Sequence, residues 1–233
     1  MQKKSVIIKT TGLIIILMMS SFFSFAQQSD QEIKADTLLA REDFANALAL
    51  YNKILDKSKP KTEEEYQLFY KRALCYYGLE NFAEALKDIT TLIDKYPKPQ
   101  AKLLRAYINQ ALEDYDAQLV DLNELMSLNP DNPEMLQWRA SVLMESEKYE
   151  EAQRDIRQLL QYQSNPQLKS YLGLTYYYQD NPDSALIMFD EIIQEDPNFV
   201  QSYVYAASLC LDESAYELAL NYINKGLQRE PSN

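Results

Sequence analysis

A segment of about 34 residues recurs along this chain, and the repeat restricts the fold more than any other feature. Five copies stand out: NFAEALKDITTLIDKYP, DYDAQLVDLNELMSLNP, KYEEAQRDIRQLLQYQSNP, NPDSALIMFDEIIQEDP and AYELALNYINKGLQREP. One aligned position, small in all copies but one, recurs at spacings of 38, 33, 34, 33 and 34 residues: Ala47, Ala85, Gln118, Ala152, Ala185 and Ala219. A fixed period near 34 predicts a helical repeat array.

Each copy contains two stretches with the apolar spacing of a helix. In the second copy Asn81 is a suitable N-cap and Glu84 follows three residues later, a pattern that starts helices. The apolar residues that follow share one helical face: Phe82, Ala85, Leu86, Ile89, Leu92 and Ile93. The preceding helix starts at a capping box formed by Thr62 and Glu65, and Pro97 ends the copy.

These signals predict an all-α chain of antiparallel helix pairs, with no stretch that alternates as β-strands do. Residues 27–233 are expected to form a six-repeat helical solenoid. The expected copies span residues 29–57, 63–96, 99–128, 133–162, 166–195 and 199–229.

The residues at fixed positions of the copies resemble those of the tetratricopeptide repeat family. The matching residues are Leu172, Gly173, Tyr176, Ala185, Phe189 and Pro197 in copy five, and Ala73, Tyr76, Phe82, Ala85 and Pro97 in copy two. Two departures are Gln118, in place of a small residue, and Pro182, in place of an aromatic. The resemblance covers the chain from about residue 29 and implies a right-handed α-solenoid whose concave groove is lined by the first helix of each pair.

An arginine and an aspartate 16 residues apart occur together in three copies: Arg72 with Asp88, Arg105 with Asp121, and Arg139 with Asp155. The other three copies lack both members and have Lys34 with Leu50, Leu172 with Met188, and Ala206 with Tyr222. Joint presence and joint loss predict an ion pair between the two helices of a copy, because losing one partner leaves a half-buried charge. A charged binding site is the alternative interpretation.

The first 26 residues have the composition of a secretory signal peptide. A basic start, MQKKSVIIKTT, precedes the 14-residue apolar run GLIIILMMSSFFSF, and small residues surround a cleavage position after Ala26. We therefore predict an exported protein of the periplasm, the cell envelope or the extracellular space. An uncleaved membrane anchor is the alternative, although the run is shorter than the roughly 20 residues that span a bilayer.

The charge of the chain disfavours two classes of partner. The net charge is −12, from 23 basic and 35 acidic residues, and cleavage after Ala26 would remove Lys3, Lys4 and Lys9 and leave −15. A strongly acidic protein is poorly suited to bind nucleic acid or an anionic membrane surface.

Little in the sequence predicts catalysis. The chain has no His and only four Gly, and it contains no phosphate-binding loop, zinc-protease or nucleophile-elbow motif. Cys75 and Cys210 fall in copies two and six, too far apart along the array for a disulfide, which needs Cα atoms within about 7 Å. We predict buried thiols, and no catalytic residue, cofactor or metal ion.

The family geometry implies which side chains line the groove, and they include the only Trp and many Tyr. The predicted partner-binding residues are Gln67, Tyr70, Tyr77, Gln100, Tyr107, Trp138, Met144, Gln167, Tyr171, Tyr177, Tyr178, Gln201 and Tyr205. Tyr and Trp are favoured at binding surfaces, and Gln offers both a donor and an acceptor to a peptide backbone. The alternative is that several of these tyrosines only pack helices together.

Together these features predict a non-enzymatic protein-interaction scaffold of the bacterial cell envelope that binds a peptide or helical segment of a partner in the groove. A clamp for chaperone C-termini is not expected, since Tyr70, Leu74 and Leu104 stand where the resemblance calls for Lys, Asn and Asn. The second hypothesis is a structural subunit of a larger envelope or secretion assembly, joined through the solenoid ends, with self-association through the apolar helix that starts near Tyr216. An enzyme or carbohydrate binder that uses the tyrosines is the third.

Overall fold

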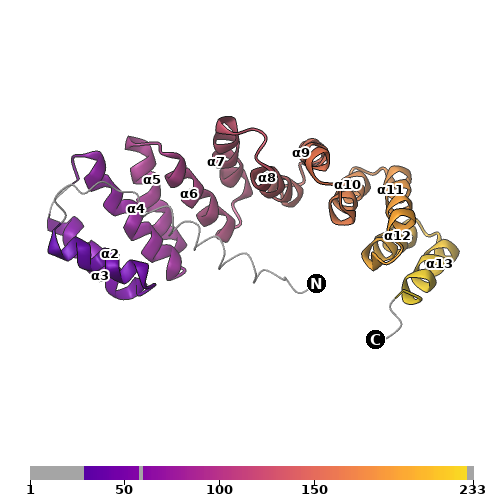
Figure 1. The fold of residues 1–233 in the computed structure, drawn as a ribbon, viewed down its shortest axis with the longest axis horizontal. Helices are drawn as coiled ribbons and strands as arrows, with labels where there is room; N and C mark the ends of the chain where they lie inside the picture. The colour runs from indigo at the N-terminus through magenta and orange to yellow at the C-terminus, as the bar shows by residue number, and fades with distance from the viewer. Residues whose placement is uncertain (1–28, 58–59, 230–233) are drawn as a thin grey trace. The chain divides into compact units, whose positions relative to one another are not determined.

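The computed structural model describes residues 29–57 and 60–229, and this part of the chain contains twelve α-helices and no strand (Figure 1). The prediction of an all-α fold of paired helices is confirmed. The predicted signal peptide, residues 1–26, lies outside the described residues.

The helices belong to two compact units, residues 1–127 and residues 128–233. The helices of the first unit are α2 (Asp30–Ala40), α3 (Phe44–Lys57), α4 (Glu63–Gly78), α5 (Phe82–Lys95), α6 (Pro99–Ala111) and α7 (Tyr115–Leu128). Those of the second unit are α8 (Pro133–Glu145), α9 (Tyr149–Tyr162), α10 (Pro166–Tyr178), α11 (Pro182–Glu195), α12 (Val200–Asp212) and α13 (Tyr216–Leu227). The repeat period alone predicts no such division.

The helices begin where the local sequence supplies caps. Thr62 and Glu65 form the predicted capping box at the start of α4. Three helices of the second unit begin with proline, and the side chain of the preceding asparagine, such as Asn165 before α10, accepts a backbone N–H of the first turn. Asn81 occupies the predicted N-cap of α5, but its side chain makes no capping hydrogen bond there.

The turn inside each pair has a recurrent backbone conformation. One residue per turn has a positive φ of 57–59°: Glu42, Glu80, Glu113, Glu147, Asp180 and Ser214. The N–H that follows this residue donates to a carbonyl at the end of the first helix, as Asn181 does to Tyr176 at 3.0 Å. This is the usual way to end a helix with a left-handed residue, a position that Gly fills most easily. The chain places acidic residues there in five of the six turns.

The predicted arginine–aspartate pairs are confirmed in all three copies. Both carboxylate oxygens of each aspartate accept from the guanidinium at 2.6–2.8 Å, in Arg72–Asp88, Arg105–Asp121 and Arg139–Asp155. Each pair joins the two helices of one repeat, and each aspartate is almost fully buried. A bidentate geometry of this kind fixes how the two helices meet.

The other three copies have different contacts at or next to the aligned positions. Leu172 lies in a buried cluster against which Met188 packs. The buried Tyr222 of α13 donates from its hydroxyl to Asp190 of α11 at 2.8 Å. In copy one Tyr51 donates in the same way to Asp36. In copy five these positions therefore join the two helices of one repeat through apolar contact, whereas the Tyr222 hydrogen bond joins copies five and six.

Both cysteines are buried free thiols, Cys75 in α4 and Cys210 in α12. Burial raises the pKa of Cys75 to about 12, mainly because the thiolate would lose its hydration. Both thiols pack in the core as small apolar side chains do.

Candidate functional site

The predicted groove residues divide between the two units, and the first unit holds five of them. Gln67 and Tyr70 on α4 are buried, with 9% and 4% of their surface exposed. Tyr77 and Tyr107 are half-buried at the same core, and the ring of Tyr77 meets Phe82 edge-on at 5.5 Å. Only Gln100 is exposed. For Gln67 and Tyr70 the structure therefore supports the packing interpretation.

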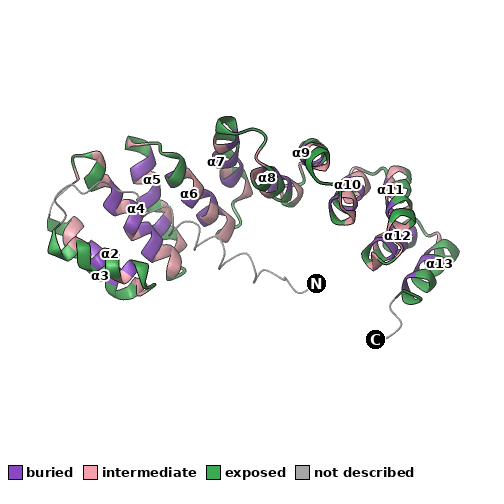
Figure 2. Ribbon diagram, viewed as in Figure 1, coloured by how far each residue is buried: buried purple, intermediate pink, exposed green. Residues whose placement is uncertain are grey.

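Helix α2 packs against α4 and accounts for part of this burial. The ammonium group of Lys71, next to Tyr70, donates to Glu32 and Asp36 of α2, at 2.9 Å to each. Another helix of the same unit therefore lies beside Lys71 of α4, and much of α4 is buried (purple in Figure 2).

The second unit holds the other eight predicted residues, and more of them are exposed. Gln167, Tyr171 and Tyr178 of α10 are exposed, and so is Gln201 of α12. The remainder are half-buried: Trp138, Met144, Tyr177 and Tyr205. Helices α10 and α12 contact each other, so their tyrosines lie on neighbouring elements.

We give the name tyrosine cluster to five tyrosines of this unit. The ring of Tyr178 contacts those of Tyr149 and Tyr177, Tyr171 lies on the same helix as Tyr177 and Tyr178, and Tyr205 lies on α12, which contacts α10. The rings of Tyr149 and Tyr178 stack with centroids 5.1 Å apart and an interplanar angle of 18°. The ring of Tyr177 is tilted against Tyr178 at 5.2 Å. Stacked and tilted pairs of this kind hold the rings in fixed orientations.

The cluster extends onto α12 through Tyr205. Its ring meets the buried Phe189 of α11 at 5.5 Å. Burial raises the pKa of Tyr205, and the nearby hydroxyls of Tyr171 and Tyr178 add to this effect. The phenol of Tyr205 therefore lies in the same electrostatic environment as the α10 tyrosines.

Carboxylates act on two tyrosines of the cluster, Tyr177 and Tyr149. The hydroxyl of Tyr177 donates to a carboxylate oxygen of Asp212, and this bond, with partial burial and the nearby charge of Glu213, raises the pKa of Tyr177 to about 12. Desolvation raises the pKa of Tyr149, and the negative charges of Glu147 and Glu145 act in the same direction. We call these four carboxylates the acidic rim: Glu145, Glu147, Asp212 and Glu213.

Sequence reasoning missed Tyr149 and Asp212 as members of this site. Tyr149 opens α9, a second helix, whereas the family geometry assigns the groove to first helices. Asp212 ends α12, where a carboxylate on a repeat helix is usually a solvated side chain. No sequence signal marks either residue, because the stacking of Tyr149 on Tyr178 joins helices of adjacent repeats.

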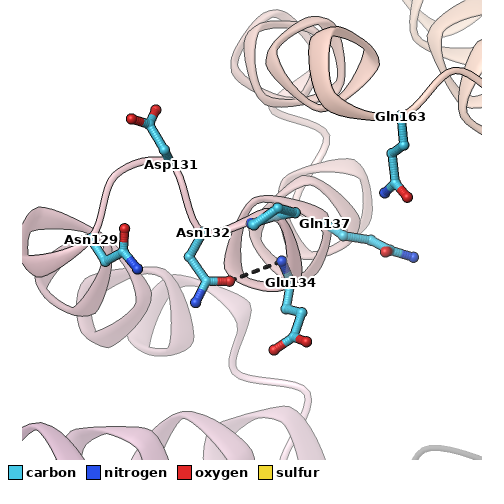
Figure 3. Close-up of a pocket in the computed structure, with 7 residues that line it drawn as sticks. Asn129, Asp131, Asn132, Glu134, Gln137 and Gln163 are labelled. Carbon is cyan, nitrogen blue, oxygen red and sulfur yellow. Dashed lines mark hydrogen bonds between the residues drawn. The ribbon is translucent and has the colours of Figure 1, made fainter.

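A polar depression of about 510 Å³ lies at the start of α8. Its lining side chains come from Asn129, Asp131, Asn132, Pro133, Glu134, Gln137 and Gln163 (Figure 3). The Asn132 side chain accepts the backbone N–H of Glu134 at 2.9 Å and so serves as the helix cap. This lining offers amides and carboxylates but neither an aromatic ring nor a nucleophile. We therefore take the tyrosine cluster as the candidate site.

Comparison with known proteins identifies the family. The tetratricopeptide repeat model matches residues 34–88, 70–133 and 139–198, more than half of the chain. The chain belongs to the tetratricopeptide repeat family, whose members are typically non-enzymatic.

Individual relatives are distant. The chain is 26% identical over 206 residues to the intraflagellar transport protein 56 homolog of Caenorhabditis elegans, and the match covers 84% of this chain but only about a third of that protein (33%). A tetratricopeptide repeat protein from Parabacteroides merdae has the same fold, with a TM-score of 0.63, 19% identity and coverage of 86% of this chain and 78% of the other. YrrB, described as having an unusual peptide-binding site, superposes with a TM-score of 0.54 and 14% identity over 78% of this chain and 93% of its own.

Within residues 29–57 and 60–229, no helix combines the length and hydropathy required to cross a bilayer. In the same residues, no three Cys, Asp or Glu side chains come together as the ligands of a metal ion would.

Proposed function

We propose that this protein is a non-enzymatic scaffold that binds a peptide or helical segment of a partner protein at the tyrosine cluster of the second unit. The observation that carries the proposal is the exposure of Tyr171 and Tyr178 on α10, beside the stacked ring of Tyr149. Large, rigid rings with a polar tip gain contact area on binding at a low cost in conformational entropy.

Family membership and one structural neighbour support this proposal. Tetratricopeptide repeat proteins commonly bind other proteins, and YrrB carries a peptide-binding site on the same fold. The exposed amides of Gln167 and Gln201 lie on the two helices that carry most of the cluster, where they offer hydrogen bonds to an extended backbone.

We also propose that the protein acts outside the cytoplasm, in the bacterial cell envelope. The support is the basic and apolar composition of residues 1–26. Sequencing the N-terminus of the purified native protein tests this, with residue 27 expected as the first residue. A native N-terminus at residue 1 in the cytoplasmic fraction would contradict it.

The experiment for the binding function is affinity capture from the cells that make the protein. The tagged full chain is compared with Tyr171→Ala/Tyr178→Ala and with Tyr162→Ala, a control at the end of α9 that is 53% exposed and outside the cluster. We expect a partner retained by the wild type and the control and lost by the double variant, with unchanged circular dichroism. Equal retention by all three would exclude the cluster as the binding site.

One observation favours the alternative of assembly through α13. Tyr216, Leu220, Ile223 and Leu227 follow helical spacing along one face, and all four are exposed. Such an apolar stripe is suited to self-association with a second copy of the chain. Sedimentation velocity tests this, because self-association predicts a sedimentation coefficient that rises with concentration and no longer does so in Leu220→Lys.

A further inference from the structure

The two units differ in charge in a way that bears on the partner. Residues 27–127, which remain after the proposed cleavage, contain 13 basic and 18 acidic side chains, a net charge of −5. Residues 128–233 contain 7 basic and 17 acidic side chains, a net charge of −10. Most of the negative charge of the chain therefore belongs to the unit that carries the tyrosine cluster, and it attracts cations over several ångströms.

The negative charge is also local to the cluster. Asp212 accepts the hydroxyl of Tyr177, and Glu213 acts on the same phenol. Glu145 ends α8 and Glu147 lies in the turn before Tyr149, and both act on the Tyr149 phenol. Carboxylates therefore act on two of the five tyrosines, which favours a positively charged ligand.

The rings themselves present faces that suit a cation. Tyr178 is 51% exposed and Tyr171 is 37% exposed, and stacking on Tyr149 fixes the orientation of Tyr178. A guanidinium or ammonium group gains favourable energy above such a ring. The planar guanidinium gains more, because it stacks on the ring and also pairs with carboxylates.

The chain already uses this contact between its own side chains. In the second unit the guanidinium of Arg157 lies 5.8 Å from the ring centre of Tyr176 and donates to its hydroxyl at 2.7 Å. In the first unit Arg72 lies 5.9 Å from the ring of Tyr76. Arginine on a helix-borne tyrosine is therefore a compatible geometry on this scaffold.

We propose that the tyrosine cluster and its acidic rim recognise an arginine-rich, extended segment of the partner protein. The inference rests on the proposed function and adds the chemistry of the ligand. Arginine side chains stack on Tyr178 and Tyr171, and their guanidinium groups pair with the acidic rim.

The test is a fluorescence-anisotropy titration of the full chain with labelled 12-residue peptides. The probe has four arginines separated by Gly-Ser pairs, and matched probes have Lys, Gln or Glu in place of Arg. We expect the Arg probe to bind best, the Lys probe several-fold more weakly, and the Gln and Glu probes not at all. Affinity for the Arg probe should fall steeply between 50 and 300 mM NaCl.

Two variants with matched controls assign the binding to the cluster. Tyr178→Leu should weaken the Arg probe about fivefold, the factor expected for one cation–π contact, while Tyr162→Leu leaves it unchanged. Asp212→Asn/Glu213→Gln should weaken it about tenfold and flatten the salt dependence, whereas Glu191→Gln/Glu217→Gln, which removes two exposed carboxylates on α11 and α13, should not.

The outcomes separate this inference from the function on which it rests. Equal affinity for the Arg and Gln probes, equal effects of cluster and control variants, or full competition by millimolar choline would overturn the arginine-rich ligand. If the captured partner still depends on Tyr171 and Tyr178 in that case, the scaffold function stands with a neutral ligand. If no captured partner depends on them, both proposals fail.

Discussion

Equivalent repeat positions on α4 of the first unit and α10 of the second unit differ in how far they are exposed. Gln67 and Lys71 on α4 are buried, and Lys71 pairs with α2. Their counterparts on α10, Gln167 and Tyr171, are exposed and lie at the tyrosine cluster. The repeat period thus determines which helical face a residue occupies, but the neighbouring helix determines whether that face is available to a partner.

The largest expected effect concerns a feature that both units share. Arg105→Ala in the first unit and Arg139→Ala in the second should each lower the free energy of unfolding by about 3 kcal/mol, because each strands a buried aspartate. Urea denaturation measures both losses. Arg139→Leu/Asp155→Met, which copies the Leu172–Met188 arrangement of copy five, should recover most of the loss. If the double variant recovered none of the lost free energy of unfolding, the ion pair would do more than join two helices.

Removing a tyrosine should cost more stability on the buried face of α4 than on the exposed face of α10. Tyr70→Ala should lower the free energy of unfolding by about 3 kcal/mol, since it empties a buried site in the first unit. Tyr178→Ala should lower it by less than about 0.5 kcal/mol, since that ring is half exposed. The same urea curves decide it, and similar costs at both positions would show that the two faces do not differ in availability.

The sequence predicted the pairing of helices and the internal ion pairs because both depend on periodic spacing. The 16-residue separation of Arg139 and Asp155 is enough to place them on facing helices, and the structure confirms their contact. The exposure of a side chain depends instead on contacts between repeats, and the spacing of residues within one copy does not predict those contacts. For that reason the sequence assigned Tyr70 and Tyr171 to one surface without distinguishing them.

A smaller effect tests the close packing of the second unit. A Cβ at Gly173 would lie 2.6 Å from the ring of Phe189, so Gly173→Ala should cost about 2 kcal/mol. Phe189→Leu shortens the opposing side chain, and the double variant should therefore lose less than the sum of the two single variants. Additive losses in thermal or urea unfolding would contradict direct contact as the cause.

The smallest effect concerns the left-handed turn residues. Glu80→Gly in the first unit and Glu147→Gly in the second should each raise the free energy of unfolding by about 0.5 kcal/mol, because Gly accepts a φ of 59° without strain. Only Glu147→Gly should also weaken the Arg probe, since only Glu147 belongs to the acidic rim. Equal weakening by both variants would remove the distinction between the units.

The sequence predicted only some of the residues that belong to the tyrosine cluster. Tyr177 and Tyr178 were found because they follow the first-helix register of α10. Tyr149 joins them from a second helix, through a stacking contact between adjacent repeats that no single copy encodes. Long-range contacts of this kind require the three-dimensional packing of α9 against α10.

The most direct test of the central claim is site-specific photocrosslinking in the cells that make the protein. A benzophenone amino acid is placed at position 171, inside the tyrosine cluster, or at position 162, at the end of α9 and outside it. We predict a crosslink to one partner from position 171 alone, suppressed by an excess of the arginine probe and mapping to an arginine-rich segment. A crosslink from position 162 that equals or exceeds that from position 171 would contradict the account.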